Sequence, residues 1–216
     1  VGLKVMDRGE RINAMTHLLG AVLAVAAAAV LVVFASLKGD AWHIVSFSIF
    51  AAALILLYSA SSAHHFAISP KVRSVFKRLD HAAVVVLIAG TYTPITLTAL
   101  RGGWGWSLFG IVWGVTLLGI IWKLSGVRAH SRFSMALYLS LGWMVVVAII
   151  PLVQALSLDI LFWLVAGGIF YTIGAGFLVL KRLPIFHTVF TPHNVFHFFV
   201  MFGSASHFWM AFLLLS

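Results

Sequence analysis

Long apolar segments alternate with short polar ones along nearly the whole chain. A helix needs about 20 apolar residues to cross the hydrocarbon core of a bilayer. Seven segments of about this length contain no Asp, Glu, Lys or Arg: Leu18–Leu37, Trp42–His65, Ala82–Leu100, Trp104–Trp122, Phe133–Leu156, Ile160–Leu180 and His193–Leu215. The pattern predicts an all-α membrane protein: a seven-transmembrane helix bundle of antiparallel neighbours. We expect one domain over residues 1–216, with residues 1–17 as an interfacial N-terminal segment.

Composition agrees with a membrane protein. Hydrophobic residues make up 62% of the 216 and charged residues only 9%, more apolar surface than a soluble core of this size needs. The absence of cysteine excludes disulfides and thiolate metal sites, so a metal would need His, Asp, Glu or water as ligands. We expect no cleavable signal peptide, because the polar N-terminus precedes an apolar segment long enough to span.

Basic residues gather in alternate connections between the predicted helices. Twelve lie on the side of the N-terminus: Lys4, Arg8, Arg11, Lys71, Arg73, Lys77, Arg78, Lys123, Arg128, Arg132, Lys181 and Arg182. The other side carries Lys38 and Arg101. The positive-inside rule therefore predicts a cytoplasmic N-terminus and an external C-terminus in the cell inner membrane. The net charge of +9 reflects this topology and contact with anionic lipid, and we expect no nucleic-acid binding.

Histidines gather at the predicted cytoplasmic ends of the helices. Seven of the ten lie there: His17, His64, His65, His81, His187, His193 and His197. Topology alone does not require such a cluster, and ionisable groups within a membrane mark function more often than not.

Helical spacing separates the two adjacent histidines of the second predicted helix. His65 shares a face with Tyr58 and Ser61, whereas His64 lies in line with Leu57. We therefore expect His65 to face inward and His64 to meet lipid headgroups or a neighbouring helix.

The last predicted helix carries one polar face over much of its length. Its members are His193 and three residues that lie within about 40° of it around the helix: His197, Ser204 and His207. His193 and His197, at i and i+4, can reach one metal ion as in the zinc-protease helix, although that motif's internal glutamate is missing here. With His65 and a water they would form an open tetrahedral zinc site. The alternative is histidines that hydrogen-bond between helices.

Two other polar residues are expected near this cluster. Asp80 is the nearest acid, and we expect it to open the third helix. It would either cap that helix or pair with His81, Lys77 or Arg78, or it would act as a base or orienting group on zinc-bound water. Ser61, four residues before His65, either returns its hydroxyl to a backbone carbonyl or hydrogen-bonds that water or Asp80.

The N-terminal pattern Glu10-x-x-Asn13-x-x-x-His17 places three polar residues on one face leading into the first span. One interpretation is an interfacial segment in which Glu10 pairs with an arginine. The other is a set of residues that support the metal-binding histidines or gate substrate access.

Together, these motifs resemble the hemolysin III branch of the progestin and adipoQ receptor (PAQR) family. The resemblance rests on Glu10-x-x-Asn13-x-x-x-His17, Ser61-x-x-x-His65, Asp80, His193-x-x-x-His197 and the flanking LDHAAVVVLIAGTYTP, residues 79–94. It implies one zinc ion near the cytoplasmic leaflet, held by His65, His193 and His197, with Ser61 and Asp80 as the other polar site positions. His64 stands where the family often has an aromatic residue, so either histidine of the pair is a candidate ligand.

The resemblance also implies a function. Adiponectin receptors and alkaline ceramidases share this arrangement, which points to a zinc-dependent intramembrane hydrolase of lipid amides that influences membrane lipid homeostasis. Asp80 and Ser61 would be its catalytic residues and a membrane lipid its substrate or ligand. The alternatives are a non-enzymatic lipid sensor or receptor-like protein with structural zinc, and an ion or proton pathway along the stripe of His197, Ser204 and His207. Pore formation gains little support from spans so poor in charge.

Overall fold

The computed structural model describes residues 7–126, 131–179 and 191–216. Of the residues named above, six lie outside this part of the chain: Lys4, Arg128, Leu180, Lys181, Arg182 and His187.

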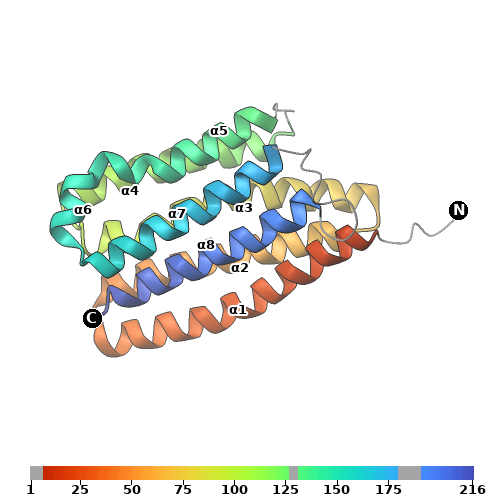
Figure 1. Ribbon diagram of the computed structural model, residues 1–216. Helices are drawn as coiled ribbons and strands as arrows, with labels where there is room; N and C mark the ends of the chain where they lie inside the picture. The colour runs from red at the N-terminus through yellow and green to blue at the C-terminus, as the bar shows by residue number, and fades with distance from the viewer. Residues whose placement is uncertain (1–6, 127–130, 180–190) are drawn as a thin grey trace, which may run out of the picture.

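The molecule is a bundle of long helices that run back and forth along one axis (Figure 1). The elements are α1 Arg8–Lys38, α2 Ala41–Phe66, α3 Pro70–Leu97, α4 Gly103–Leu124, α5 Ser131–Gly142, the 3₁₀ segment η1 Trp143–Ala148, α6 Ile149–Ala155, α7 Leu158–Val179 and α8 Pro192–Leu213. Within the described residues, seven helical spans are long and apolar enough to cross a membrane, and there is no strand. The predicted seven-helix membrane fold is therefore confirmed.

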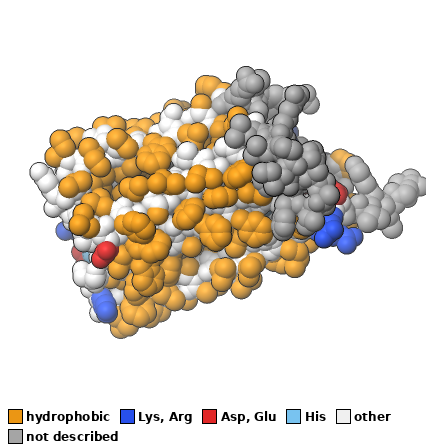
Figure 2. Space-filling model, in the orientation of Figure 1, with side chains coloured by type: hydrophobic (Ala, Val, Ile, Leu, Met, Phe, Trp, Pro, Cys, Tyr) orange, Lys and Arg blue, Asp and Glu red, His pale blue; other side chains and the backbone are white. Residues whose placement is uncertain are grey.

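The antiparallel arrangement brings the starts of α1, α3 and α8 together with the end of α2 (Figure 1). We call this the histidine end, and the other the opposite end. Hydrophobic side chains cover the long face of the bundle, and Lys and Arg appear near its two ends (Figure 2). This distribution matches a protein that is surrounded by lipid along its length and by water at its ends.

The third helix begins twelve residues before the apolar segment that predicted it. α3 starts at Pro70, a favoured first position for a helix, and Asp80 lies about three turns inside it. The expectation that Asp80 opens this helix was therefore wrong. Hydropathy detects only the part of a helix that meets hydrocarbon. The helical backbone hydrogen bonds of α3 continue beyond that part, toward its N-terminus. For the same reason α1 begins at Arg8, so residues 8–17 form its first turns.

The fifth predicted helix is not continuous. The 3₁₀ segment η1 separates α5 from α6, and Pro151 follows it, where the missing N–H and the bulk of the ring disfavour a regular α-helix. Tyr92 of α3 meets the irregular backbone: its hydroxyl lies 2.9 Å from Leu141 O and 2.7 Å from Gly142 O, and it accepts a hydrogen bond from Val145 N at 2.8 Å. The break is thus stabilised by a contact between helices.

Helices α7 and α8 pack closely because α7 presents glycine to its neighbour. A Cβ at Gly174 would lie 2.9 Å from the Cβ of Phe199, and one at Gly167 would overlap the ring of His207. Small residues allow such close approach between membrane helices. Here the approach occurs within one chain.

Candidate metal centre

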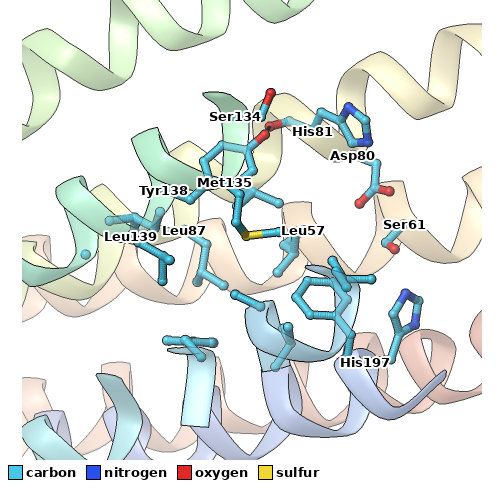
Figure 3. Close-up of a pocket in the computed structure, with 18 of the residues that line it drawn as sticks. Leu57, Ser61, Asp80, His81, Leu87, Ser134, Met135, Tyr138, Leu139 and His197 are labelled. Carbon is cyan, nitrogen blue, oxygen red and sulfur yellow. Dashed lines mark hydrogen bonds between the residues drawn. The ribbon is translucent and has the colours of Figure 1, made fainter. Parts of the chain in front are cut away.

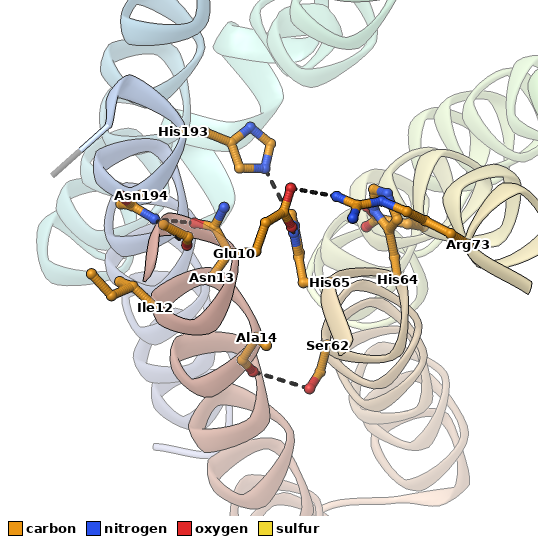
Figure 4. A network of polar contacts seen from close by, with 12 residues as sticks. Glu10, Ile12, Asn13, Ala14, Ser62, His64, His65, Arg73, His193 and Asn194 are labelled. Carbon is orange, nitrogen blue, oxygen red and sulfur yellow. Dashed lines mark hydrogen bonds and ion pairs between the residues drawn. The ribbon is translucent and has the colours of Figure 1, made fainter. Parts of the chain in front are cut away.

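Three imidazoles from two helices converge at the histidine end. His65 lies in the last turn of α2, and His193 and His197 occupy the first two turns of α8. His193 Nε2 is 3.4 Å from His65 Nε2 and 3.1 Å from His197 Nε2. His65 and His197 are buried and His193 is half-buried. Figure 4 shows His193 pointing toward His65 across the gap between the helices.

Glu10 connects α1 to this group. Its Oε2 lies 2.6 Å from His65 Nδ1, and its Oε1 accepts a hydrogen bond from Arg73 of α3 (Figure 4). Because a carboxylate only accepts, Nδ1 of a neutral His65 carries the proton and Nε2 keeps its lone pair. Metal-binding histidines usually donate their second ring N–H to such an acceptor. Glu10 therefore fixes the ring of His65 with its unprotonated Nε2 on the side of His193.

The N-terminal turns of α1 and α8 are fixed to each other by asparagines. Asn194 Nδ2 donates to Asn13 Oδ1 at 2.5 Å and to Gly9 O at 3.0 Å. Asn194 also forms a reciprocal cap with Thr191, in which Thr191 N donates to Asn194 Oδ1 at 2.7 Å and Asn194 N donates to Thr191 Oγ1 at 3.2 Å. This cap holds the first turn of α8, and so positions His193 and His197.

His17 lies flat against a member of the group. Its ring stacks on that of His197 with centroids 3.5 Å apart and planes at 12°, and Tyr58 meets it edge-on. The nitrogen lone pairs of two stacked rings lie in nearly parallel planes and do not converge on one ion, so His17 supports the face of His197 rather than adding a ligand beside it. His17 is 2% exposed, which places it inside the bundle.

His64 turns toward α3. Its Nδ1 lies 3.1 Å from Asp80 Oδ2, and both side chains are largely buried. The neighbouring-helix alternative therefore holds for His64 and the lipid-headgroup alternative does not. Asp80 takes His64 as its hydrogen-bond partner, rather than His81, Lys77 or Arg78. Figure 3 shows its carboxylate directed toward the hydroxyl of Ser61, a residue that is 1% exposed.

These side chains line one end of a cavity of about 1620 Å³. The cavity is larger than the ~300–1,000 Å³ typical of ligand pockets. Its walls extend from the histidines and Asp80 to apolar side chains of α2, α3 and α5, including Leu57, Leu87 and Leu139 (Figure 3). A polar group at the histidine end and an apolar chain beyond it would both find suitable surroundings.

The donor set suits a divalent cation. Ring nitrogens of His65, His193 and His197 lie within 4.8 Å of one another, and a second set of His64, His65 and Asp80 meets the same limit. His193 Nε2 can donate to His65 Nε2 only when it carries the proton; in the other neutral tautomer both nitrogens present lone pairs and can bind a cation. Three neutral imidazoles with an oxygen ligand form a common zinc site. The described residues thus include a His/Asp group that could hold a metal ion.

The sequence analysis missed three features that support the candidate site: the side chains of Arg73 and Asn194, and the contact between His64 and Asp80. Asn194 stands at the third position after the capping Thr191, where capping boxes place their reciprocal partner, so this signal was available. Arg73 and the pairing of His64 with Asp80 depend on how α2 and α3 face each other, and no local pattern reports that.

Comparison with known proteins agrees with this architecture. A profile of the family described as Haemolysin-III related matches residues 7–208. The chain is 40% identical over 196 residues to Hemolysin-3 of Bacillus cereus, covering 91% of this chain and 87% of that protein. It is also 40% identical over 199 residues to the Hemolysin-3 homolog of Bacillus subtilis (strain 168), covering 92% and 91% respectively. The chain therefore belongs to the haemolysin III family, a branch of the PAQR family.

Proposed function

We propose that this membrane protein is a zinc-dependent hydrolase of lipid amide bonds. The observation that carries the proposal is the position of the three imidazoles, with Asp80 and Ser61, at the polar end of a large apolar cavity. His65, His193 and His197 would hold the ion. When bound there, zinc supplies Lewis acidity, which polarises carbonyl groups and makes water a nucleophile near neutral pH.

The protein side chains divide the remaining tasks. Asp80 accepts a proton from the attacking water, and His64, hydrogen-bonded to Oδ2, holds that carboxylate in place. The hydroxyl of Ser61 orients the water or the substrate carbonyl. Glu10 fixes the ring of His65, while the cap formed by Thr191 and Asn194 fixes the start of α8.

The cavity indicates the substrate class. Its volume and apolar walls suit a lipid chain, with the amide at the histidine end. A substrate already dissolved in the bilayer would reach it laterally, between helices. Hydrolysis would release a free fatty acid and an amine, and would thereby change the lipid composition of the membrane.

The test is turnover by purified protein. Zinc-loaded and chelator-treated protein would be incubated with ceramides and other N-acyl lipids, and released fatty acid would be measured by mass spectrometry. We expect release only from the zinc-loaded sample and restoration on adding zinc back. Fully loaded protein that releases no fatty acid from any of these lipids would contradict the proposal.

A second candidate function is favoured by one observation. Because Asp80 belongs with His65 to the second potential metal group, its carboxylate could complete the coordination of the ion and close the site. Zinc would then be structural, in a protein that senses lipids. X-ray absorption at the zinc edge separates the two: a water as fourth ligand favours catalysis, and a carboxylate favours structure.

We also propose that the histidine end faces the cytoplasm of a bacterial cell. The imbalance of Lys and Arg supports this orientation. The chain has no native cysteine, so single cysteines report topology cleanly. Ser69→Cys, at the histidine end, should resist a membrane-impermeant thiol reagent in intact cells, whereas Ser157→Cys, at the opposite end, should react. The reverse labelling would refute the orientation.

A further inference from the structure

One further histidine, His207, lies deep in the bundle, away from the proposed metal-binding group of His65, His193 and His197. His207 is ten residues after His197 on α8, which corresponds to about 15 Å along the helix axis. Its side chain is 6% exposed and lies beside the ring of Tyr171 from α7, with centroids 5.4 Å apart. The absence of a side chain at Gly167 makes room for its ring.

The hydrogen bonds of His207 determine which nitrogen is available. Nε2 lies 3.2 Å from Leu164 O, and since a carbonyl only accepts, Nε2 must carry the proton. Nδ1 is then an acceptor. It is buried and has no hydrogen-bond partner among the described residues. A buried acceptor without a partner is unfavourable, so a donor group is expected to meet it.

Neighbouring hydroxyl groups are already engaged. The hydroxyl of Tyr58 donates to Ser204 Oγ at 2.8 Å, and Tyr171 Oη lies 3.0 Å from the same oxygen. These hydroxyl groups bond to one another, and none of them hydrogen-bonds to His207 Nδ1, which remains an acceptor to be matched.

The cavity that begins at the histidine end continues to this position. His207, Leu164 and Tyr171 line it together with His65 and His193. A lipid chain whose carbonyl lies at the metal-binding group would therefore extend toward His207. An extended chain advances roughly 1.2 Å per bond, so about 15 Å corresponds to roughly a dozen bonds.

We propose that His207 forms a specificity subsite for a hydroxyl group carried far along the lipid chain. The hydroxyl, roughly a dozen bonds from the carbonyl carbon, donates its proton to Nδ1 of His207. This assignment rests on the proposed function insofar as that function places the carbonyl at the histidine end. It adds a preference for hydroxylated over plain acyl chains.

The test compares three fatty acids on purified, zinc-loaded protein: stearic acid, 12-hydroxystearic acid and 3-hydroxystearic acid. Dissociation constants would be measured by competition with a fluorescent fatty acid. We expect 12-hydroxystearic acid to bind about 2- to 10-fold more tightly than stearic acid, the effect of one net hydrogen bond. The 3-hydroxy acid, whose hydroxyl cannot reach His207, should show no such gain.

Two variants locate the effect. His207→Phe should abolish the preference for the 12-hydroxy acid while stearic acid still binds. His207→Gln, which keeps an acceptor oxygen, should retain part of it and guards against misfolding of the first variant. Equal binding of the three acids by the wild type, or an unchanged preference in His207→Phe, would overturn the subsite.

The outcome is separable from that of the hydrolase test. Selective binding without turnover of any N-acyl lipid would retain the subsite and refute the hydrolase. Turnover of N-acyl lipids without a preference for the 12-hydroxy acid would retain the hydrolase and refute the subsite.

Discussion

The two ends of the bundle each contain a hydrogen-bonded His–Asp pair, and the pairs differ in how they form. At the opposite end, His43 Nδ1 lies 2.8 Å from Asp40 Oδ1, three residues away in the sequence. At the histidine end, His64 Nδ1 lies 3.1 Å from Asp80 Oδ2 on another helix. The Asp40 side chain is 54% exposed and that of Asp80 only 14%.

The difference shows that residue type alone does not identify function. Asp40 caps α2 by accepting hydrogen bonds from the backbone of Trp42 and His43, a structural task confined to one turn. Asp80 lies inside α3, faces Ser61 and belongs to a potential metal group (Figure 3). Burial and partners from other helices distinguish a candidate site from a helix cap.

The largest expected effect comes from removing an imidazole at the histidine end. His193→Ala leaves two of the three proposed histidine ligands, too few to retain zinc through purification, so metal content should fall from about one ion per chain to nearly none. Elemental analysis measures it. His43→Ala, at the opposite end, is the matched control and should retain the metal. Equal zinc content in the two variants would show that the three imidazoles do not bind it.

Removing the charge of Asp80 should abolish most turnover without loss of metal. Asp80→Asn is expected to lower the rate of N-acyl lipid hydrolysis by about 10²- to 10⁴-fold, the usual contribution of a general base. Asp40→Asn should leave the rate unchanged. If Asp80→Asn instead loses its zinc, the carboxylate is a ligand and the structural alternative is favoured.

A smaller effect is expected from the residue that orients His65. Glu10→Gln weakens the acceptor for His65 Nδ1–H, and zinc affinity should fall about 10- to 100-fold, as measured by competition with a chelator. Arg73→Gln serves as the comparison, because it removes a partner of Glu10 but leaves the contact with His65. A larger loss for Arg73→Gln than for Glu10→Gln would argue against this role of Glu10.

The smallest effect is expected at the opposite end. The hydrogen bond from His43 lowers the pKa of Asp40, so its capping contribution is present above the ordinary aspartate pKa of about 3.9 and is lost as pH falls through the lower folded value. Asp40→Ala should therefore lower Tm slightly at pH 7, and the difference from wild type should shrink near pH 3. Zinc content should be unaffected at pH 7. A difference in Tm that grows toward low pH would contradict this account.

Local patterns predicted much of the fold and part of the candidate site. Spans follow from apolar length, since a bilayer requires about 20 residues per helix, and the seven expected spans are present. The face shared by His193 and His197 follows from their spacing of four, and the start of α8 from Thr191-Pro192. Each of these features depends on residues within a few turns of one another.

Tertiary structure alone decided the rest. The partner of Asp80, the stacking of His17 on His197 and the contact of Tyr92 with the break after α5 all join helices distant in sequence. Such contacts depend on the rotation, depth and crossing of separate helices, which the periodicity of a single helix does not encode. The same holds for the cavity between the three imidazoles and His207, because its shape is set by side chains from several helices at once.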